Sequence, residues 1–145
     1  MNTRGLAFLV LPLILLFATG GTATGKLTVT SAWARATAPG AGMGAVYLHI
    51  ENGSSKSDRL LKISTTVATS ASVHQTEIID DVARMREVAM LHVAPGEKID
   101  FAPGGLHIML IGLKKPLFVG QKFELEMLFE VSGPRKVKVV VQDSL

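Results

Sequence analysis

Hydrophobic and polar residues alternate along much of the chain, which is the pattern of β-strands that bury one face and expose the other. The clearest example is segment 122–131, and segments 46–51 and 137–141 repeat it. The positions predicted to face the core are Phe123, Leu125, Met127, Phe129, Val131, Val46, Leu48, Ile50, Val137, Val139 and Val141. No segment carries a convincing helical stripe of apolar residues, so the pattern predicts strands throughout.

Turn-forming residues separate these segments at short intervals. They cluster at residues 39–44, 52–55, 95–96, 103–105 and 133–134. Short strands at this spacing predict an all-β domain, an antiparallel β-sandwich or barrel of about seven to nine strands. Asp80 and Asp81 are expected at a hairpin tip, because adjacent side chains on a strand point to opposite faces and would not act as a carboxylate pair.

Residues 1–23 predict a cleaved secretory signal peptide. Arg4 precedes an apolar run over residues 6–18, and small residues ending at Ala23 follow it. The run is shorter than the ~20 apolar residues of a membrane-spanning helix and contains Pro12, which disfavours an uncleaved anchor. We therefore expect residues 24–145 to form a single exported, soluble β-domain with no stable membrane insertion.

The composition of the chain excludes several classes of function. Without Arg4 the chain has 14 basic and 12 acidic residues, too balanced for a nucleic-acid-binding protein. Arg135, Lys136 and Lys138 form a modest basic cluster, which is either a solvated strand face or a docking patch for an acidic partner. The chain has no cysteine, so it lacks disulfides, a thiol nucleophile and the thiolate of a blue-copper electron carrier. No spacing of serine, histidine and acid indicates a hydrolase, and we predict that the protein is not an enzyme.

Four side chains suggest metal chemistry: His74, Met85, His107 and Met109. Imidazole nitrogen and thioether sulfur are ligands that Cu(I) accepts and that hard, oxygen-seeking ions do not favour. His107 and Met109 lie two apart in a predicted strand, so they project from one face and can bind one ion together. Each residue taken alone is explained more simply as a core or surface position, so the metal hypothesis rests on the combination.

The four residues follow the spacing His-x10-Met-x21-His-x-Met, beginning at His74. This spacing is similar to the binding motif of the PCu(A)C family of periplasmic copper chaperones. The chain also resembles that family over segment 104–117, GGLHIMLIGLKKPL, and over segments 32–37 and 44–48. The resemblance therefore covers most of the chain after the predicted signal peptide.

The resemblance implies a cupredoxin-like β-sandwich or barrel that binds Cu(I) through the two histidines and the two methionines. It also implies a periplasmic metallochaperone that transfers copper by ligand exchange toward the binuclear copper centre of a haem-copper oxidase. An oxidase subunit and a Sco-type thiol protein would be its partners. Segment 139–145 lacks the histidine- and methionine-rich tail that provides some relatives with an additional Cu(II) site, so we expect one copper ion per chain.

A different function class remains open, a metal-free exported β-sandwich that serves as an interaction or assembly module. In that case the four residues would be ordinary packing and surface positions. Of the other histidines and methionines, His49 and His92 are expected to face solvent and Met90 and Met127 to lie in the core. Met43, in a glycine-rich segment, is kept as a possible auxiliary ligand.

The predicted ligand set makes copper binding sensitive to acid. Thioethers do not titrate, but an imidazole binds metal only when it is neutral, so Cu(I) affinity is expected to weaken below the ordinary histidine pKa of ~6.5. Competition titrations at about pH 7.5 and about pH 5 measure the effect. Equal affinity at the two pH values would count against histidine ligation.

Overall fold

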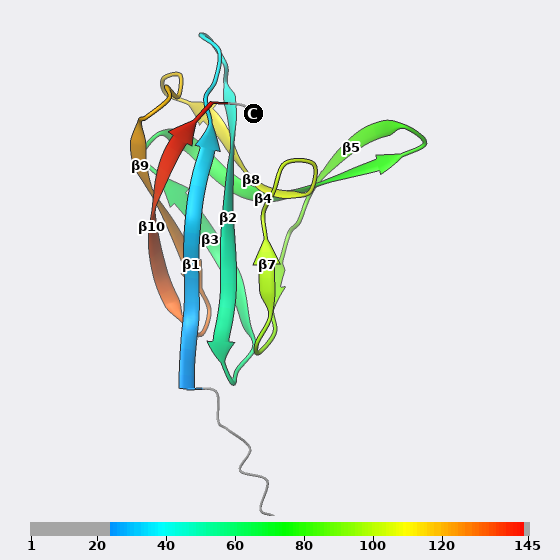
Figure 1. The fold of residues 1–145 in the computed structure, drawn as a ribbon, viewed down its shortest axis with the longest axis vertical. Helices are drawn as coiled ribbons and strands as arrows, with labels where there is room; N and C mark the ends of the chain where they lie inside the picture. The colour runs from blue at the N-terminus through cyan, green and yellow to red at the C-terminus, as the bar shows by residue number, and fades with distance from the viewer. Residues whose placement is uncertain (1–23, 144–145) are drawn as a thin grey trace, which may run out of the picture.

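The computed structural model describes residues 24–143, which form ten β-strands and, within that range, no helix (Figure 1). The strands are β1 (Thr24–Arg35), β2 (Met43–Ser54), β3 (Asp58–Thr65), β4 (Ala68–Ile79), β5 (Val82–Glu87), β6 (Leu91–Val93), β7 (Lys98–Asp100), β8 (Leu106–Leu113), β9 (Lys122–Phe129) and β10 (Gly133–Gln142). The predicted signal peptide over residues 1–23 lies outside the described residues.

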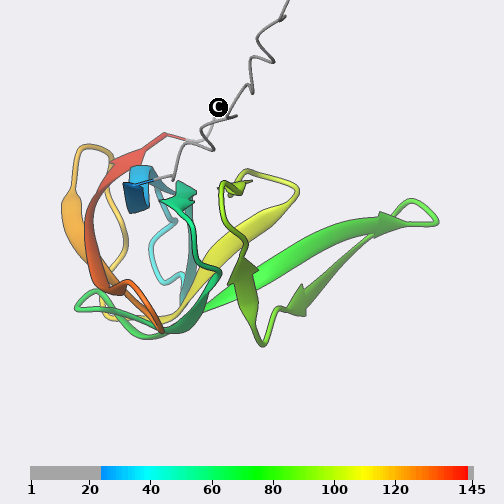
Figure 2. The same ribbon diagram turned by 90° about the horizontal axis from the view of Figure 1, so that it is seen from below.

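Seven of the strands close into a barrel in the order β4-β8-β2-β1-β10-β9-β3, with β3 pairing back onto β4 through Ile63 and Ala71 (Figures 1 and 2). The strands β5, β6 and β7 extend the sheet from β4, β3 and β2. The all-β, cupredoxin-like prediction is confirmed. The seven barrel strands fall within the predicted number, and the three additional strands bring the total to ten.

The sequence predicted an antiparallel sheet, but one pair of neighbouring strands is parallel. The strands β1 and β10 run parallel, with Trp33 opposite Val140 and Arg35 opposite Gln142. These strands come from opposite ends of the described chain, so no hairpin turn dictates their relative direction. The other strand pairs of the described sheet are antiparallel.

The core lies inside the barrel and follows the predicted alternation. The predicted residues of β2, β9 and β10 that are buried there are Val46, Leu48, Ile50, Phe123, Leu125, Met127, Phe129, Val139 and Val141, with Val137 packed partly buried against them. Two core predictions are wrong. Val131 is exposed because β9 ends at Phe129, which leaves Val131 in the turn before β10. Met90 is exposed because it lies between β5 and β6, outside a strand.

A bulge in β1 changes which side of the strand faces the core. The register with β2 shifts between Thr30 and Trp33, and Ser31 has a positive φ of 55°. Leu27 is buried before the bulge, whereas Ala34 is buried after it. Odd-numbered residues therefore face the core before the bulge, and even-numbered residues face it afterwards. The bulge therefore turns Trp33 to the outer face, where its ring lies 4.5 Å, centroid to centroid, from that of Tyr47.

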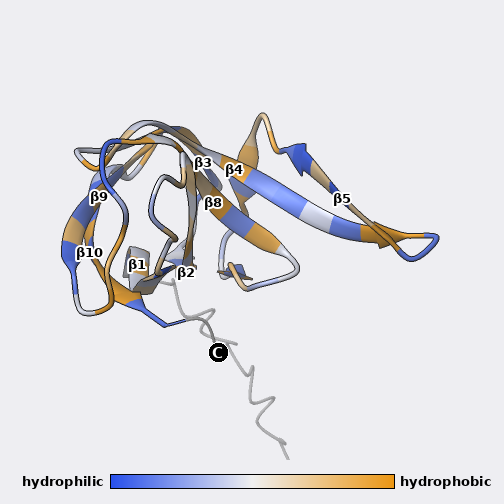
Figure 3. Cartoon of the chain, turned by 90° about the horizontal axis from the view of Figure 1, so that it is seen from above, coloured by the Kyte–Doolittle hydropathy of each residue, from blue (hydrophilic) through white to orange (hydrophobic). Residues whose placement is uncertain are grey.

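The strands β4 and β5 form a hairpin that projects away from the barrel (Figures 1 and 2). Asp80 and Asp81 form its two-residue turn with φ angles of 51° and 61°, as a two-residue hairpin loop with left-handed residues requires, and the predicted hairpin tip is confirmed. Near the tip the ribbon carries hydrophobic residues (Figure 3), and Ile78, Ile79 and Val82 are exposed there. All six residues of β5 are exposed, so this strand lies outside the core.

The predicted break at Asn52 falls later in the chain. The strand β2 continues to Ser54, and the buried Asn52 side chain organises the turn that follows. Its amide nitrogen donates to the carbonyls of Lys56 and Val93 at 2.8 and 3.0 Å, and its oxygen accepts from the Ser54 backbone N–H at 3.1 Å. Asparagine forms this turn through its side chain, so its backbone remains in the strand.

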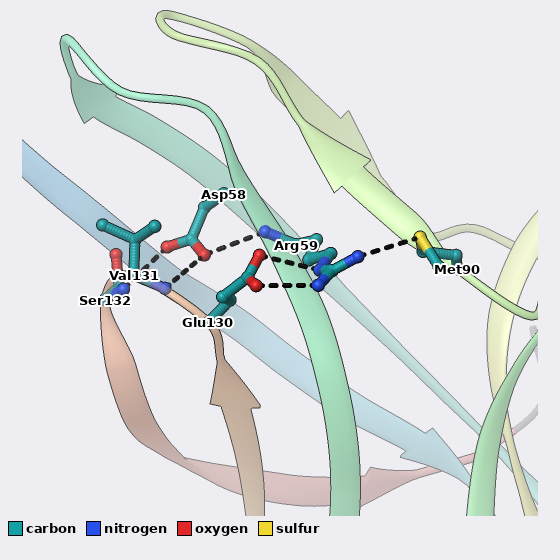
Figure 4. Close-up of polar contacts among 6 residues, drawn as sticks. All are labelled: Asp58, Arg59, Met90, Glu130, Val131 and Ser132. Atoms are coloured by element: carbon teal, nitrogen blue, oxygen red, sulfur yellow. Dashed lines mark hydrogen bonds and ion pairs between the residues drawn. The ribbon is translucent and has the colours of Figure 1, made fainter.

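Asp58 is a buried carboxylate at the start of β3 that holds the turn between β9 and β10 (Figure 4). It accepts hydrogen bonds from the backbone N–H groups of Arg59, Val131 and Ser132 at 2.8, 2.9 and 2.8 Å. Burial by itself raises the pKa of Asp58, but the hydrogen bonds from Ser132 and from these backbone groups outweigh it and hold the pKa below its ordinary value.

The neighbouring Arg59 ties the same strands together on the outer side (Figure 4). Its Nη2 donates to Glu130 Oε1 at 2.7 Å, and its Nε lies 2.7 Å from Glu130 Oε2. Its Nη1 donates to the sulfur of Met90 at 3.7 Å. The exposed Met90 is therefore packed against a cation.

Asp58→Asn is expected to destabilise the fold by about 1–3 kcal/mol, because a neutral amide cannot replace both carboxylate oxygens as acceptors. The folded-state pKa of Asp58 lies below the ordinary value of 3.8, so its stabilisation is fully present above that value and is lost as the pH falls through the folded-state pKa. Urea unfolding at about pH 6 and about pH 3 should show a larger loss for the native chain than for the variant.

Asp81→Asn is the matched control, because that residue lies at the exposed hairpin tip and asparagine tolerates its positive φ. Equal destabilisation by the two substitutions would contradict the role given to Asp58.

Candidate metal centre

The strands β4 and β8 bring His74 and His107 directly opposite each other in an antiparallel pair. Their ring centroids lie 6.0 Å apart, with the ring planes inclined by 32°. Both histidines lie on the outer face of the barrel wall, because the neighbouring Val73 and Ile108 belong to the core. The register thus gathers two imidazoles from residues far apart in the sequence.

His107 is only 5% exposed, although it lies on the outer face of its strand. Its Nδ1 is 3.1 Å from the carbonyl oxygen of Gly105. A carbonyl can only accept, so Nδ1 carries the hydrogen of the neutral ring and Nε2 keeps its lone pair. That Nε2 is buried and has no hydrogen-bond partner. A buried polar atom without a partner costs free energy, and a metal ion would relieve that cost.

His74 shows the same arrangement with the ring nitrogens exchanged. Its Nε2 lies 3.0 Å from the hydroxyl oxygen of Ser72, while its Nδ1 is buried and has no hydrogen-bond partner. When Nε2–H donates to the hydroxyl, the lone pair is on Nδ1. Each ring therefore has one nitrogen held by the protein and one free to bind, as in protein sites where the second ring nitrogen orients the ligand.

The two methionines approach from either side of this pair. Met109 follows His107 on the same face of β8 and lies opposite Ser72. Met85 lies on the projecting hairpin, opposite Thr76, and Thr76 and His74 share one face of β4. Met85 is 52% exposed, whereas Met109 is half-buried.

A hollow of about 300 Å³ opens in front of these residues. Met85, His107 and Met109 line it, and His74 lies beside it through its pairing with His107. The other lining residues are Arg35, Ala36, Thr37, Met43, Gly44, Ala45, Tyr47 and Thr76. The four residues singled out in the sequence thus occupy neighbouring positions on the three adjacent strands β5, β4 and β8.

Sequence reasoning missed Ser72, Gly105 and Arg35. Ser72 and Gly105 each precede a histidine by two residues, which is the spacing that puts neighbours on one side of a strand and is the one signal that points to them. Arg35 lines the hollow, and its Nε is buried without a hydrogen-bond partner. A fixed positive charge repels every cation, but it repels a divalent ion more strongly than a monovalent one. Arg35 therefore disfavours a divalent occupant relative to a monovalent one.

The other candidate groups do not assemble into a comparable site. Within residues 24–143, no three histidine, aspartate or glutamate side chains gather so that they could hold a metal ion. His92 is exposed as predicted, whereas His49 is partly buried and its Nδ1 lies 2.6 Å from Asp100 Oδ1.

One member of the basic cluster on β10, Lys136, is paired with acidic neighbours. The ammonium of Lys136 lies 3.0 Å from a carboxylate oxygen of Glu124 and 3.5 Å from one of Glu126. The hydrogen bond with Glu124 is the main cause that raises the pKa of Lys136. The charge of Lys136 is thus partly balanced within the strand pair, which favours a solvated strand face at this position.

Residues 27–141 match the model of the LpqE-like family, described as putative lipoprotein LpqE-like, which comprises PCu(A)C domains. The chain belongs to this family. It is 32% identical over 126 residues to a putative lipoprotein of Leifsonia xyli subsp. xyli, a match that covers 86% of the chain and 75% of that protein. The PCu(A)C resemblance predicted from the sequence is thereby confirmed.

Solved structures of PCu(A)C domains share the fold. The apo PCuAC domain from PmoF1 superposes with a TM-score of 0.67 at 29% identity, over 83% of this chain and 96% of that one. The solution structure of Cu(I)-DR1885 from Deinococcus radiodurans superposes with a TM-score of 0.66 at 24% identity, over 88% of this chain and 85% of that one.

The family is described as putative lipoproteins, and the sequence of this chain contains no cysteine. Among residues 24–143, no helix has the length and apolar character needed to cross a bilayer.

The hydrogen bond to Gly105 predicts the tautomer of His107 in the metal-free protein. At mildly alkaline pH, long-range ¹H–¹⁵N NMR spectra are expected to show the hydrogen of His107 on Nδ1 and an unprotonated Nε2. The exposed His92 serves as the internal reference. A His107 ring with its hydrogen on Nε2 would contradict the arrangement and remove the free nitrogen from the site.

Proposed function

We propose that this PCu(A)C domain is a metallochaperone that binds one Cu(I) ion through His74, Met85, His107 and Met109 and passes it to a cuproprotein. The proposal is supported most strongly by the two buried ring nitrogens, His74 Nδ1 and His107 Nε2, which have no hydrogen-bond partner. A purely structural pair of histidines would be expected to satisfy both nitrogens of each ring.

The donor set favours the reduced ion. Two imidazoles and two thioethers suit a soft d¹⁰ ion without strong geometric demands, whereas Cu(II) prefers tetragonal nitrogen and oxygen ligands. Thioethers are neutral and poor ligands for zinc. Arg35 lines the hollow, and its positive charge repels divalent Cu(II) more strongly than Cu(I).

The difference in exposure between the ligands suggests how the ion would leave. The imidazole nitrogens are buried, whereas Met85 is half-exposed on a hairpin whose outer strand lies outside the core. A thioether also binds more weakly than an imidazole. An incoming ligand of the acceptor can therefore displace Met85 first and take the ion without releasing it to solvent.

The cellular role is proposed from the family. The predicted signal peptide supports export, and the family supports a periplasmic location. The acceptor would be a haem-copper oxidase subunit, with a Sco-type thiol protein as second partner. Carriage of an ion by ligand exchange requires no catalytic group, and we propose that the domain is not an enzyme. The alternative remains a metal-free exported β-domain that serves as an interaction or assembly module.

Anaerobic titration of the protein with Cu(I) against a chromophoric chelator tests the proposal. The native chain is expected to bind one equivalent tightly, and His107→Ala/Met109→Ala is expected to lose more than about 100-fold in affinity, because half of the ligands are removed. His92→Ala/Met90→Ala removes the same residue types outside the hollow and should bind like the native chain.

Thermal unfolding separates loss of the site from loss of the fold, since His107 is buried. Cu(I) should raise the unfolding midpoint of the native chain and of the control variant but not that of the double variant. If the native chain fails to compete with the chelator and its midpoint ignores Cu(I), the metal-free module is the better description.

A further inference from the structure

We propose that Met43 is a transit ligand, a third thioether that holds Cu(I) at the mouth of the hollow while the ion enters or leaves the four-ligand site. This inference rests on the proposed function. It assigns a role to a methionine outside the His-x10-Met-x21-His-x-Met spacing.

The strand register places Met43 on the outer face near the proposed ligands. Ala45 of β2 lies opposite Met109 of β8, and Met43 lies two residues before Ala45, opposite Ile111. Residues two apart on a strand share a face, so Met43 projects from the same face as Met109. Met43 also lines the hollow together with Met85, His107 and Met109.

Exposure orders these groups from solvent inward. Met43 is 59% exposed and Met85 is 52% exposed, whereas Met109 is half-buried and His107 is almost fully buried. An ion that approaches through the hollow would therefore meet the sulfurs of Met43 and Met85 before it reached either imidazole. Packing does not require a large side chain at the mouth, because Met43 lies outside the core cluster of the described residues.

The chemistry of a thioether suits this step. Sulfur binds Cu(I) without losing a proton, and the flexible methionine side chain can follow a moving ion. In transit, the copper–sulfur bond to Met43 forms as one bond to His74, Met85, His107 or Met109 breaks, and the ion remains Cu(I). No oxidant, reductant or proton is needed. The step lowers the barrier for exchange and adds little to the final four-ligand state.

A ligand used only in transit changes rates without changing the equilibrium. Met43→Leu keeps the size and apolar character of the side chain and removes its sulfur. We expect uptake of Cu(I) and its release to a chelator both to slow by about fivefold or more, while the equilibrium affinity changes by less than about threefold. Anaerobic stopped-flow measures both rates, and Met90→Leu, at an exposed methionine outside the hollow, should leave them unchanged.

Methionine methyl NMR provides a readout independent of the transfer rate. In protein with ¹³C-labelled methionine methyl groups, Cu(I) below one equivalent is expected to broaden or shift the Met43 signal together with those of Met85 and Met109. The signals of Met90 and the core Met127 should not move. A similar response to Ag(I), which has the same charge and d¹⁰ configuration, would support direct contact with the ion.

Two results would overturn the inference in different ways. If Met85 and Met109 respond to Cu(I) while the Met43 signal stays fixed, or if Met43→Leu transfers copper at the native rate, Met43 is not a transit ligand and the four-ligand site stands. If no methionine responds and no Cu(I) binds, the proposed function itself is wrong. Loss of affinity in Met43→Leu equal to that of His107→Ala/Met109→Ala would instead make Met43 a permanent ligand and also overturn the transit role.

Discussion

The antiparallel register between β4 and β8 is the constraint on which the candidate centre depends. It sets His74 opposite His107 and, one position along on the opposite face, Val73 opposite Ile108 in the core. A slip of one residue would turn Val73 outward and His74 into the apolar interior. The free energy of burying the core therefore also fixes the position of the two imidazoles. No further interaction is needed to hold β4 and β8 in this register.

Among the proposed ligands, Met85 is held less firmly by the fold than the two imidazoles. The imidazoles lie on barrel strands, and each has one nitrogen held by a neighbouring oxygen, the carbonyl of Gly105 or the hydroxyl of Ser72. Met85 lies on a hairpin strand that is exposed along its whole length, where local opening costs little free energy. The proposed carrier role suits this difference, because firmly held nitrogens would retain an ion while the exposed Met85 could be displaced by another protein.

The fold class was predictable because it follows from local rules. Alternating apolar residues in segments such as 122–129 predicted strands, and their inward positions were correct up to Phe129, where the strand ends. The hairpin tip at Asp80 and Asp81 was also predictable, since two residues that accept positive φ suit a two-residue turn. The predicted break at Asn52 was misplaced, because its side chain makes the turn while its backbone stays in β2.

The sequence by itself determined that this is a β-protein without thiols and which histidines and methionines are candidate ligands, because alternation and spacing are properties of the chain. Only the tertiary structure decided that the bulge at Ser31 changes which residues of β1 face the core, and that β1 and β10 run parallel. It also decided which ring nitrogen of each histidine is free and that Met43 and Arg35 line the same hollow. These features depend on pairing between residues far apart in sequence, and such pairing is selected by the whole core rather than by any local pattern.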